Sequence, residues 1–433
     1  MTVLVPLRDV AAATAERVGP KAATLARLCR AGLPVPDGVV LPAEVYRAAL
    51  AAAGVAAAAE RVAGADEAGA RRLALEVRLG LTRAPLDDLP APTGLVAVRS
   101  SALLEDTPHA CAAGQFETFL GVADVRDLVT AVRACWASLW STRALRYLRD
   151  RGLDPAATAM AVLVQRLVPA RAAGGALSRT PDGGMLLTGA WGLGASVAHG
   201  EVVPDRFRLG ADGSLAGVEP GVKDRLVACE GDVGPRARPV AGALVATPCL
   251  EASEAEELGR LVRAAESILG TPVEVEWALG DAGLEILQAR PLRVESLPAL
   301  DAVWARGPAE APPSPGGWGG GVGGGGRSRL TGHPSGLGRG SGRACVVRRE
   351  GDLDHVGLGD VLVTRVAGPA LAAVLPRVAG VVAELGGSSS HLAALARERG
   401  IPAVLGVPGA TRRIPEGAQV AVDGITGVVH WTR

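Results

Sequence analysis

Four polar residues on a predicted β-hairpin could bind a metal ion and a phosphate. The two strands cover residues 273–279 and 284–289, and Gly280-Asp281-Ala282-Gly283 joins them. Side chains alternate along a strand, so we expect one face to carry two carboxylates, an amide and a guanidinium, from Glu274, Glu276, Gln288 and Arg290. Carboxylate and amide oxygens suit Mg²⁺ beside nucleotide phosphates, and a guanidinium can hold a phosphate through two hydrogen bonds. The pattern alone leaves an alternative, a solvated polar face with ordinary cross-strand ion pairs.

A histidine that follows a glycine turn is the second candidate. Residues 380–385 read as a strand, residues 386–390 as a turn, and residues 391–399 as a helix ended by Gly400. His391 therefore lies at or near a helix N-terminus, where free N–H groups and the dipole favour an anion such as a phosphoryl group. The same dipole tends to keep a histidine neutral, and the neutral imidazole is the nucleophilic form. A capping or packing histidine is the alternative.

Two basic residues upstream are further candidates for phosphate contacts. Arg99 ends a short apolar strand in the stretch VAVRSSALLED, although a helix capped by Ser100 or Ser101 would explain this stretch as well. Lys21 starts a helix, and the chain has only one other lysine, Lys223. The Ala, Gly and Arg content indicates a GC-rich coding bias, under which Arg replaces Lys wherever Arg serves as well. A lysine that persists suggests a specific role, because ammonium and guanidinium groups are not interchangeable.

The elements that must position these residues fall into two groups. In the first we expect helices at 21–31, 40–53, 66–79, 125–149 and 253–269, and strands at 95–98 and 159–167. We expect Ser253 to cap the last of these helices, with Glu256 completing a capping box and Gly270 ending it. The second group contains short strands that suggest a compact α/β unit, at 344–348, 361–364, 380–383, 403–405, 420–422 and 428–430.

A stretch rich in Gly and Pro separates the two groups. Residues 307–343 have no hydrophobic period, so we expect a flexible linker. The glycine loop at Gly192-Leu-Gly194 lacks a full dinucleotide-binding or P-loop pattern.

Composition limits the class of protein. A length of 433 residues predicts two or three domains, and with 48% hydrophobic but only 3% aromatic residues the cores must consist mainly of Ala, Val and Leu. The 45 basic and 45 acidic side chains balance, which argues against a nucleic-acid-binding protein. Six scattered cysteines without a CxxC pair argue against a zinc site or a disulfide framework, and predict free thiols in a reducing cytoplasm. We expect neither a signal peptide nor a membrane span.

In combination, these segments resemble the phosphoenolpyruvate synthase and pyruvate phosphate dikinase family, which includes rifampin phosphotransferases. VGPKAATLARLCRAGLPVPDGVVL is similar to the opening helix of the family, and VAVRSSALLEDTPHACAAGQFETFLGV to its Arg-Ser-Ser segment. VEVEWAL with EILQARP resembles the Mg-ATP hairpin, and GGSSSHLAALARERGIPAVLGV resembles the phosphohistidine loop. The four segments stand in the family order and span most of the chain.

The resemblance implies an α/β and α+β multidomain protein that uses ATP and Mg²⁺. An ATP-grasp-like domain of two subdomains would span residues 1–295, a connection 296–343, and a small swivelling α/β phosphohistidine domain 344–433. In such enzymes the β-phosphate of ATP is transferred to the histidine and AMP is released, and the linker lets the histidine visit two sites in turn. His391, Arg290 and Lys21 would be catalytic.

The remaining site residues also follow from the resemblance. Lys21 and Arg99 would bind ATP phosphates, Arg290 would hold a phosphate, and Glu276 with Gln288 would hold Mg²⁺. Gln165 and Glu274 would be further contacts to ATP.

Three departures from the family pattern bear on function. Ala195 replaces the acidic residue of a Gly-Leu-Gly-Glu loop, and Ser178-Arg179 replaces a Phe-Thr pair. We expect no pyruvate-binding barrel after the phosphohistidine segment and no drug-binding domain between the two parts. We therefore expect either a phosphotransferase whose acceptor is pyruvate on a separate barrel subunit or another small molecule, or a non-catalytic nucleotide-binding or phosphocarrier module that regulates a partner protein. No nucleic-acid or membrane partner is expected, and the predicted location is the cytoplasm.

Overall fold

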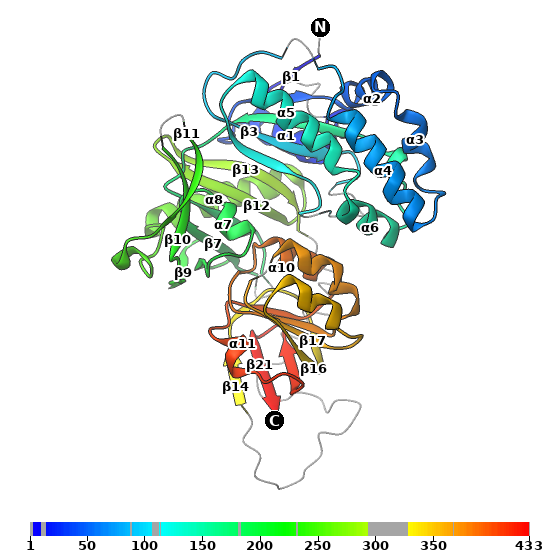
Figure 1. Ribbon diagram of the computed structural model, residues 1–433. Coiled ribbons are helices and arrows are strands. Elements are labelled where there is room, and N and C mark those ends of the chain that lie inside the picture. The colour runs from blue at the N-terminus through cyan, green and yellow to red at the C-terminus, as the bar shows by residue number, and fades with distance from the viewer. Residues whose placement is uncertain are drawn as a thin grey trace.

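Three sheets divide the chain into three lobes in the computed structural model (Figure 1). The structure describes residues 3–9, 14–86, 89–105, 112, 114–180, 183–230, 233–292, 328–366 and 368–432. The N-terminal lobe contains a five-stranded sheet, the middle lobe a six-stranded sheet, and the C-terminal lobe an eight-stranded sheet. The expected mixed α/β multidomain architecture is confirmed.

The N-terminal lobe has an antiparallel sheet with helices on both faces. Its strands, in spatial order, are β1 (Val5–Pro6), β2 (Gly38–Leu41), β5 (Met160–Arg166), β3 (Val96–Ala102) and β4 (Thr118–Val122). Its helices are α1 (Ala15–Arg30), α2 (Ala43–Ala52), α3 (Ala56–Arg61), α4 (Glu67–Leu81), α5 (Val125–Ser138) and α6 (Thr142–Asp150). On β5, Leu163 packs in the same core as α1, whereas Val162 and Val164 pack in the core that contains α2, α4 and α5. This strand is therefore apolar on both faces, which explains its continuous hydrophobic run.

Two predicted helices of this lobe are wrong in their bounds. The predicted helix 40–53 begins later, at Ala43, because residues 38–41 pair as β2 and Pro42 precedes the first turn. The predicted helix 125–149 is two helices, since Ser141 starts a new one by accepting a hydrogen bond from the N–H of Ala144 at 3.1 Å.

The start of α1 has a kink that brings it against β3. Gly19 has φ 77° and ψ 154°, so the helix is interrupted there and resumes at Pro20. A Cβ atom on Gly19 would overlap the carbonyl oxygen of Ser101. The glycine therefore permits a close approach of the two backbones that a larger residue would prevent.

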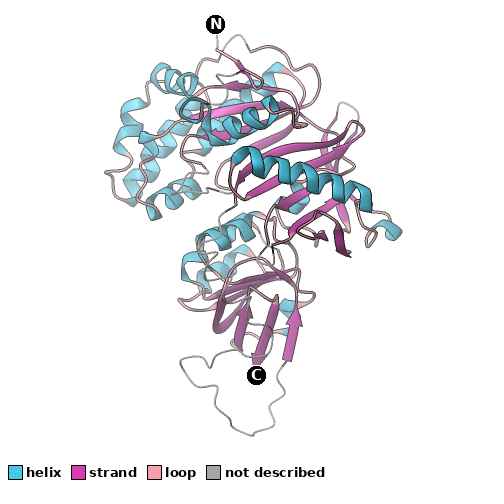
Figure 2. Ribbon diagram, turned by 180° about the vertical axis from the view of Figure 1, so that it is seen from behind, coloured by secondary structure: helices cyan, strands magenta, loops and turns pink. Residues whose placement is uncertain are grey.

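The middle lobe carries the predicted hairpin. Its sheet runs β13 (Gly283–Pro291), β12 (Val273–Gly280), β6 (Ala172–Leu177), β7 (Met185–Trp191), β8 (Asp205–Leu209) and β9 (Leu215–Glu219). A separate pair, β10 (Arg225–Glu230) and β11 (Val233–Pro239), lies beside it with the short helix α7 (Ala195–Ala198). The longer helix α8 (Ala252–Leu269) lies across the sheet, as Figure 2 shows.

The cap of α8 differs from the prediction. Glu251 is the N-cap, and its N–H donates to Glu254 at 2.8 Å in a capping box. The helix therefore begins earlier than the predicted Ser253 cap, and Glu256 instead accepts from the N–H of Leu215. Gly270 ends the helix in a left-handed conformation, φ 76°, as predicted.

The C-terminal lobe has a mixed sheet. Its strands, in spatial order, are β14 (Ser328–Thr331), β21 (Val428–Thr432), β20 (Gln419–Asp423), β16 (Arg339–Val347), β17 (Val361–Thr364), β18 (Gly380–Ala383), β19 (Ala403–Leu405) and β15 (His333–Pro334). The pairs from β16 to β19 are parallel. The helices α10 (His391–Glu398) and α11 (Ala410–Arg413) join strands, and α10 lies at the end of the lobe nearest the other two (Figure 1).

The predicted linker 307–343 is wrong over its second half. Residues 328–331, 333–334 and 339–343 are strands of the C-terminal sheet, so this lobe starts well before residue 344. A Cβ atom on Gly340 would overlap the carbonyl oxygen of Ala379, and one on Gly342 that of Gly359. These glycines serve close packing of backbones rather than flexibility. The part of the predicted linker at 307–327 lies outside the described residues.

The cores consist mainly of Ala, Val and Leu, as predicted, with a few large aromatic side chains at their centres, including Trp136, Trp140 and Trp277. Within the described ranges five cysteines are free thiols, Cys29, Cys135, Cys229, Cys249 and Cys345. None of the described helices has the length and apolar character needed to cross a membrane.

Candidate active site

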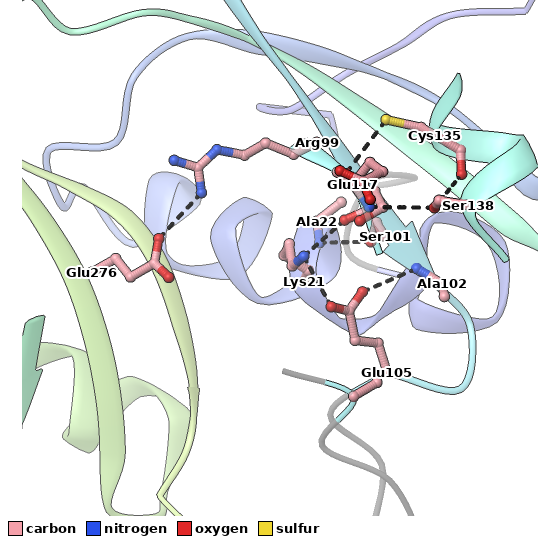
Figure 3. Close-up of polar contacts among 12 residues, drawn as sticks. Lys21, Ala22, Arg99, Ser101, Ala102, Glu105, Glu117, Cys135, Ser138 and Glu276 are labelled. Carbon is pink, nitrogen blue, oxygen red and sulfur yellow. Dashed lines mark hydrogen bonds and ion pairs between the residues drawn. The ribbon is translucent and has the colours of Figure 1, made fainter. Parts of the chain in front are cut away.

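Lys21 is buried between α1 and β3. Its ammonium group donates to the carbonyl oxygen of Ser100 at 2.9 Å and pairs with Glu105 at 3.0 Å (Figure 3). Glu105 also accepts from the N–H of Ala102 at 3.2 Å, and both charged side chains are less than a tenth exposed. The pair fixes the one lysine of the described N-terminal lobe at the end of β3.

Arg99 connects the N-terminal lobe to the middle lobe. Its Nη1 lies 3.4 Å from Oε2 of Glu276 on β12, and Figure 3 shows the side chain reaching from β3 toward that strand. Its Nε is buried and has no hydrogen-bond partner among the described residues. A buried donor without an acceptor fits a site that takes an anionic group such as a phosphate.

Gln165 lies on the same face of the sheet as Arg99. It pairs directly with Ala97 on β3, and directly opposed residues of antiparallel strands point to the same side. Its amide nitrogen donates to the carbonyl oxygen of Pro36 at 3.1 Å, and the side chain is buried. Its contact with ATP stays a prediction.

The hairpin places the four predicted polar residues in two cross-strand pairs. Glu274 is opposite Arg290, and Glu276 is opposite Gln288. The register shifts after Glu276, so that Trp277 pairs with Ile286 and both are fully buried. Arg290 donates to Glu274 at 3.0 Å, whereas Glu276 and Gln288 remain partly exposed.

His391 is brought to these residues by the C-terminal lobe. Ser390 caps α10 by accepting from the N–H of Ala393 at 3.3 Å, so His391 is the first residue of the helix, as predicted. A Cβ atom built on Gly114 would lie 3.2 Å from Cγ of His391, so the N-terminal lobe packs directly against the imidazole. The ring of His199, after α7 of the middle lobe, has its centroid 5.9 Å away at an angle of 42°. His391 therefore lies where the three lobes meet.

Burial keeps the imidazole neutral. It lowers the pKa of His391 to about 4, and the positive charges of Arg290 and Lys21, with His199, act in the same direction, while Glu276 opposes them. The sequence predicted a neutral histidine from the helix dipole, and the structure identifies burial as the main cause. At neutral pH the imidazole is thus in its nucleophilic form.

Both hairpin carboxylates remain ionised. Burial acts to raise the pKa of Glu274, but Arg290 and Arg397 outweigh it, so the pKa is lowered. Burial likewise opposes ionisation of Glu276, and Arg99 and the other nearby groups lower its pKa. An ionised carboxylate opposite an amide gives an oxygen donor set that fits Mg²⁺ held jointly with phosphate groups. Within the described ranges no group of three or more His, Cys, Asp or Glu residues could hold a metal alone.

Several residues near the site were missed from the sequence. Arg397 of α10 donates to both carboxylate oxygens of Glu274 at 3.2 Å, and Thr188 of β7 donates to the hydroxyl of Ser389 at 2.8 Å. His199 and Gly114 adjoin His391. All these contacts join different lobes, so no local pattern could indicate them. Glu105 was visible as an acidic residue after the Arg-Ser-Ser segment, but nothing in the sequence indicated its pairing with Lys21.

The two departures at 178–179 and 195 lie in structured elements. Ser178 accepts from the N–H of Val273 at 2.8 Å, and Arg179 pairs with Glu266 at the surface. Ala195 is the first residue of α7, between the glycine loop and His199. The second lysine, Lys223, is fully buried in an ion pair with Asp205 and has a structural role.

Comparison with known proteins shows two family matches along the chain. Residues 15–303 match the pyruvate phosphate dikinase AMP/ATP-binding domain, and residues 356–427 match the mobile domain of PEP-utilising enzymes. The chain is 31% identical to the phosphoenolpyruvate synthase of Aeropyrum pernix, over 95% of this chain and 56% of that protein. It is also 31% identical to a probable phosphoenolpyruvate synthase of Methanothermobacter thermautotrophicus, over 95% of this chain and 61% of that protein. The chain thus spans a little over half the length of these relatives.

Proposed function

Because this chain belongs to the pyruvate phosphate dikinase family and carries phosphoenolpyruvate synthase-like phosphotransferase domains, we propose that it transfers the β-phosphate of ATP to His391. AMP leaves, the γ-phosphate leaves as phosphate or pyrophosphate, and the phosphohistidine passes its phosphoryl group to an acceptor. The observation that carries this proposal is the position of His391, a neutral imidazole against Gly114 and close to the charges of Lys21, Arg290 and Glu276.

We call the transfer of the phosphoryl group from ATP to His391 the loading reaction. The residues of the site have different roles in it. Lys21, Arg99 and Arg290 supply positive charge where the phosphate groups of ATP develop negative charge, which is the main source of catalysis in phosphoryl transfer. A nitrogen of His391 forms a bond to the β-phosphorus while the bond from that phosphorus to the oxygen of AMP breaks, so the histidine first carries the β- and γ-phosphates. Water or inorganic phosphate then attacks the γ-phosphorus, the bond between the γ-phosphorus and the bridging oxygen breaks, and the γ-phosphate leaves as phosphate or pyrophosphate. The pairing of Lys21 with Glu105 holds the ammonium group in one place before ATP arrives.

The hairpin supplies the contacts to metal and nucleotide. Glu276 and Gln288 would hold Mg²⁺, which neutralises phosphate charge when bound. Glu274 and Gln165 are proposed ATP contacts. Glu274 accepts a hydrogen bond from Arg290, and Gln165 donates one to the carbonyl oxygen of Pro36.

The proposed acceptor is pyruvate held by a separate pyruvate-binding barrel subunit, or another small molecule. The name phosphoenolpyruvate synthase, borne by relatives that are longer than this chain, supports pyruvate. A split synthase would need the barrel protein for acceptor-dependent AMP formation, whereas a small-molecule phosphotransferase would form AMP with its acceptor alone.

The test is incubation of the full chain with Mg²⁺ and ATP labelled in the β-phosphate. We expect acid-labile label on the protein and release of AMP. His391→Ala should take up no label, and His430→Ala, at an exposed position on β21, should be labelled like the wild type. Uptake of label by His391→Ala, or none by the wild type, would contradict the proposal.

Ala195 supports a second candidate, a non-catalytic nucleotide-binding or phosphocarrier module that regulates a partner protein. It stands next to the glycine loop, where the family pattern has an acidic residue. ATP binding without AMP formation under all acceptors would support this function, and steady AMP release would exclude it.

A further inference from the structure

Tyr147 of α6 has a hydroxyl group that bonds to two segments on either side of it. The hydroxyl donates to Oε1 of Glu398 on α10 at 2.6 Å and accepts from the N–H of Ala112 at 2.9 Å. The side chain is 4% exposed. One buried oxygen atom therefore connects the C-terminal lobe to the chain between β3 and β4 of the N-terminal lobe.

The Ala112 side of this connection leads to the imidazole. Gly114, two residues on, packs against His391. Ala112 has φ 51°, a left-handed conformation that disfavours residues with a Cβ atom, and its carbonyl accepts from the N–H of Gln115 at 3.0 Å. The hydrogen bond from its N–H to Tyr147 holds the Ala112 backbone in this conformation, two residues before Gly114.

The Glu398 side leads to the helix that carries the histidine. Glu398 is the last residue of α10 and His391 is the first. Arg151 also pairs with Glu398 at 2.8 Å, and its guanidinium lies over the ring of Tyr147, 5.3 Å from the centroid. Arg399 lies 3.6 Å from Asp150 at the end of α6. The C-terminal end of α10 is thus attached to α6, and Tyr147 is at the centre of the attachment.

We propose that Tyr147 is a positioning residue for the loading reaction: its hydroxyl sets α10 and the backbone at Ala112 and Gly114 in register, so that His391 faces the ATP site. This role rests on the function proposed above. Tyr147 acts through Glu398 and Ala112 and is not assigned any contact with ATP. Burial and the adjacent Glu398 raise the pKa of Tyr147 above its ordinary value, so the hydroxyl keeps the proton that it donates.

The second described tyrosine offers a matched control. Tyr46 is also buried, 1% exposed, and its hydroxyl accepts from Nε1 of Trp140 at 2.9 Å inside the N-terminal lobe. Tyr147→Phe and Tyr46→Phe each remove one buried hydroxyl and keep the ring. Only the first removes a contact between lobes.

The experiment measures single-turnover labelling of His391 at saturating ATP in both variants. We expect Tyr147→Phe to load about tenfold more slowly or worse, the effect of losing a buried hydrogen bond to a charged group. Its ATP dissociation constant should equal that of the wild type, and Tyr46→Phe should load at the wild-type rate. Equal loading by the two variants would overturn the proposal, as would a loss of ATP affinity in Tyr147→Phe that accounts for its slower labelling.

Two further measurements separate this role from a structural one and from the proposed function. In a double-mutant cycle, the reductions in labelling rate caused by Tyr147→Phe and Glu398→Gln should not add, because both substitutions remove the same contact. Simple additivity of the two reductions would count against the positioning role. Small-angle X-ray scattering without nucleotide should give a larger radius of gyration for Tyr147→Phe than for Tyr46→Phe. If the wild type takes up no label, the proposed function fails, and unchanged scattering in Tyr147→Phe then removes the positioning role as well.

Discussion

Arg397 on α10 reaches the carboxylate of Glu274 on β12, with Nη2 3.2 Å from each of its two oxygens. Glu274 also accepts from Arg290 of the neighbouring strand at 3.0 Å. One largely buried carboxylate is therefore shared by an arginine of the C-terminal lobe and an arginine of the proposed phosphate site. The contact of the C-terminal lobe with the middle lobe and the position of Arg290 are linked through this side chain.

Glu274→Gln should weaken docking, because the amide keeps the size of the side chain and loses the charge that two guanidinium groups face. We expect single-turnover labelling of His391 to slow about tenfold or more, since charged hydrogen bonds at buried positions contribute about 1.5–3 kcal/mol each. Glu266→Gln is the control, because its partner Arg179 is half exposed and lies in the same lobe. Equal labelling rates in the two variants would show that the shared carboxylate does not matter for loading.

The pKa of His391, about 4 in the folded chain, predicts how loading depends on pH. The imidazole stays neutral from pH 8 down to pH 5, so its ionisation should not slow loading until the pH approaches 4. The unfolded chain binds this proton near pH 6.5. The free energy of unfolding should therefore fall as the pH drops from 6.5 to 4, and below pH 4 the ionisation of His391 should lower it no further. An NMR titration, with the resonance assigned by its absence in His391→Ala, measures the value directly, and a midpoint near 6.5 would contradict the prediction. Glu276→Gln should lower the pKa further, because Glu276 raises it.

Lys21→Met should affect both stability and loading, and a second substitution separates the two. It leaves the carboxylate of Glu105 buried without its cation, which typically costs about 3–5 kcal/mol. The double variant Lys21→Met, Glu105→Gln should recover most of the free energy of unfolding in a urea titration and still take up no label from ATP. Labelling by the double variant at the wild-type rate would exclude Lys21 from the phosphate site.

Gly340→Ala tests whether the glycines at 328–343 serve close packing. The added methyl group would overlap the carbonyl oxygen of Ala379, so we expect the free energy of unfolding to fall by about 1–3 kcal/mol. Gly351→Ala meets open space and should change stability by less than about 1 kcal/mol. Thermal unfolding of the two variants compares them, and equal melting temperatures would favour a flexible segment at 340.

Local patterns predicted the parts of the site that lie on single elements. Alternation along a strand gave the polar face of Glu274, Glu276, Gln288 and Arg290, since a cross-strand pair depends only on the hairpin register. A glycine turn followed by a helix gave the position of His391 at a helix N-terminus. These predictions needed no knowledge of how the lobes meet.

Contacts between lobes could not be read from the sequence. Glu398 and Tyr147 are separated by 251 positions, and no sequence motif around either residue indicates a contact between lobes. Glycine misled the prediction at 328–343 for a different physical reason, because the same residue permits flexibility in a free chain and close approach in a packed one. The strand pairing of Gly340 with Val422 and its close approach to the carbonyl of Ala379 identify the packed case.

The charge of Glu276 acts on His391, and its effect would change when the histidine is phosphorylated. Before loading, a neutral imidazole faces an ionised carboxylate, and the two do not repel. After loading, the histidine would carry a phosphoryl group with about two negative charges, which Glu276 would repel while Lys21 and Arg290 would attract it. The charge of Glu276 would thus oppose retention of the charged product and would not oppose return of the uncharged imidazole. Glu276 would in this way favour departure of the C-terminal lobe after loading over departure before it.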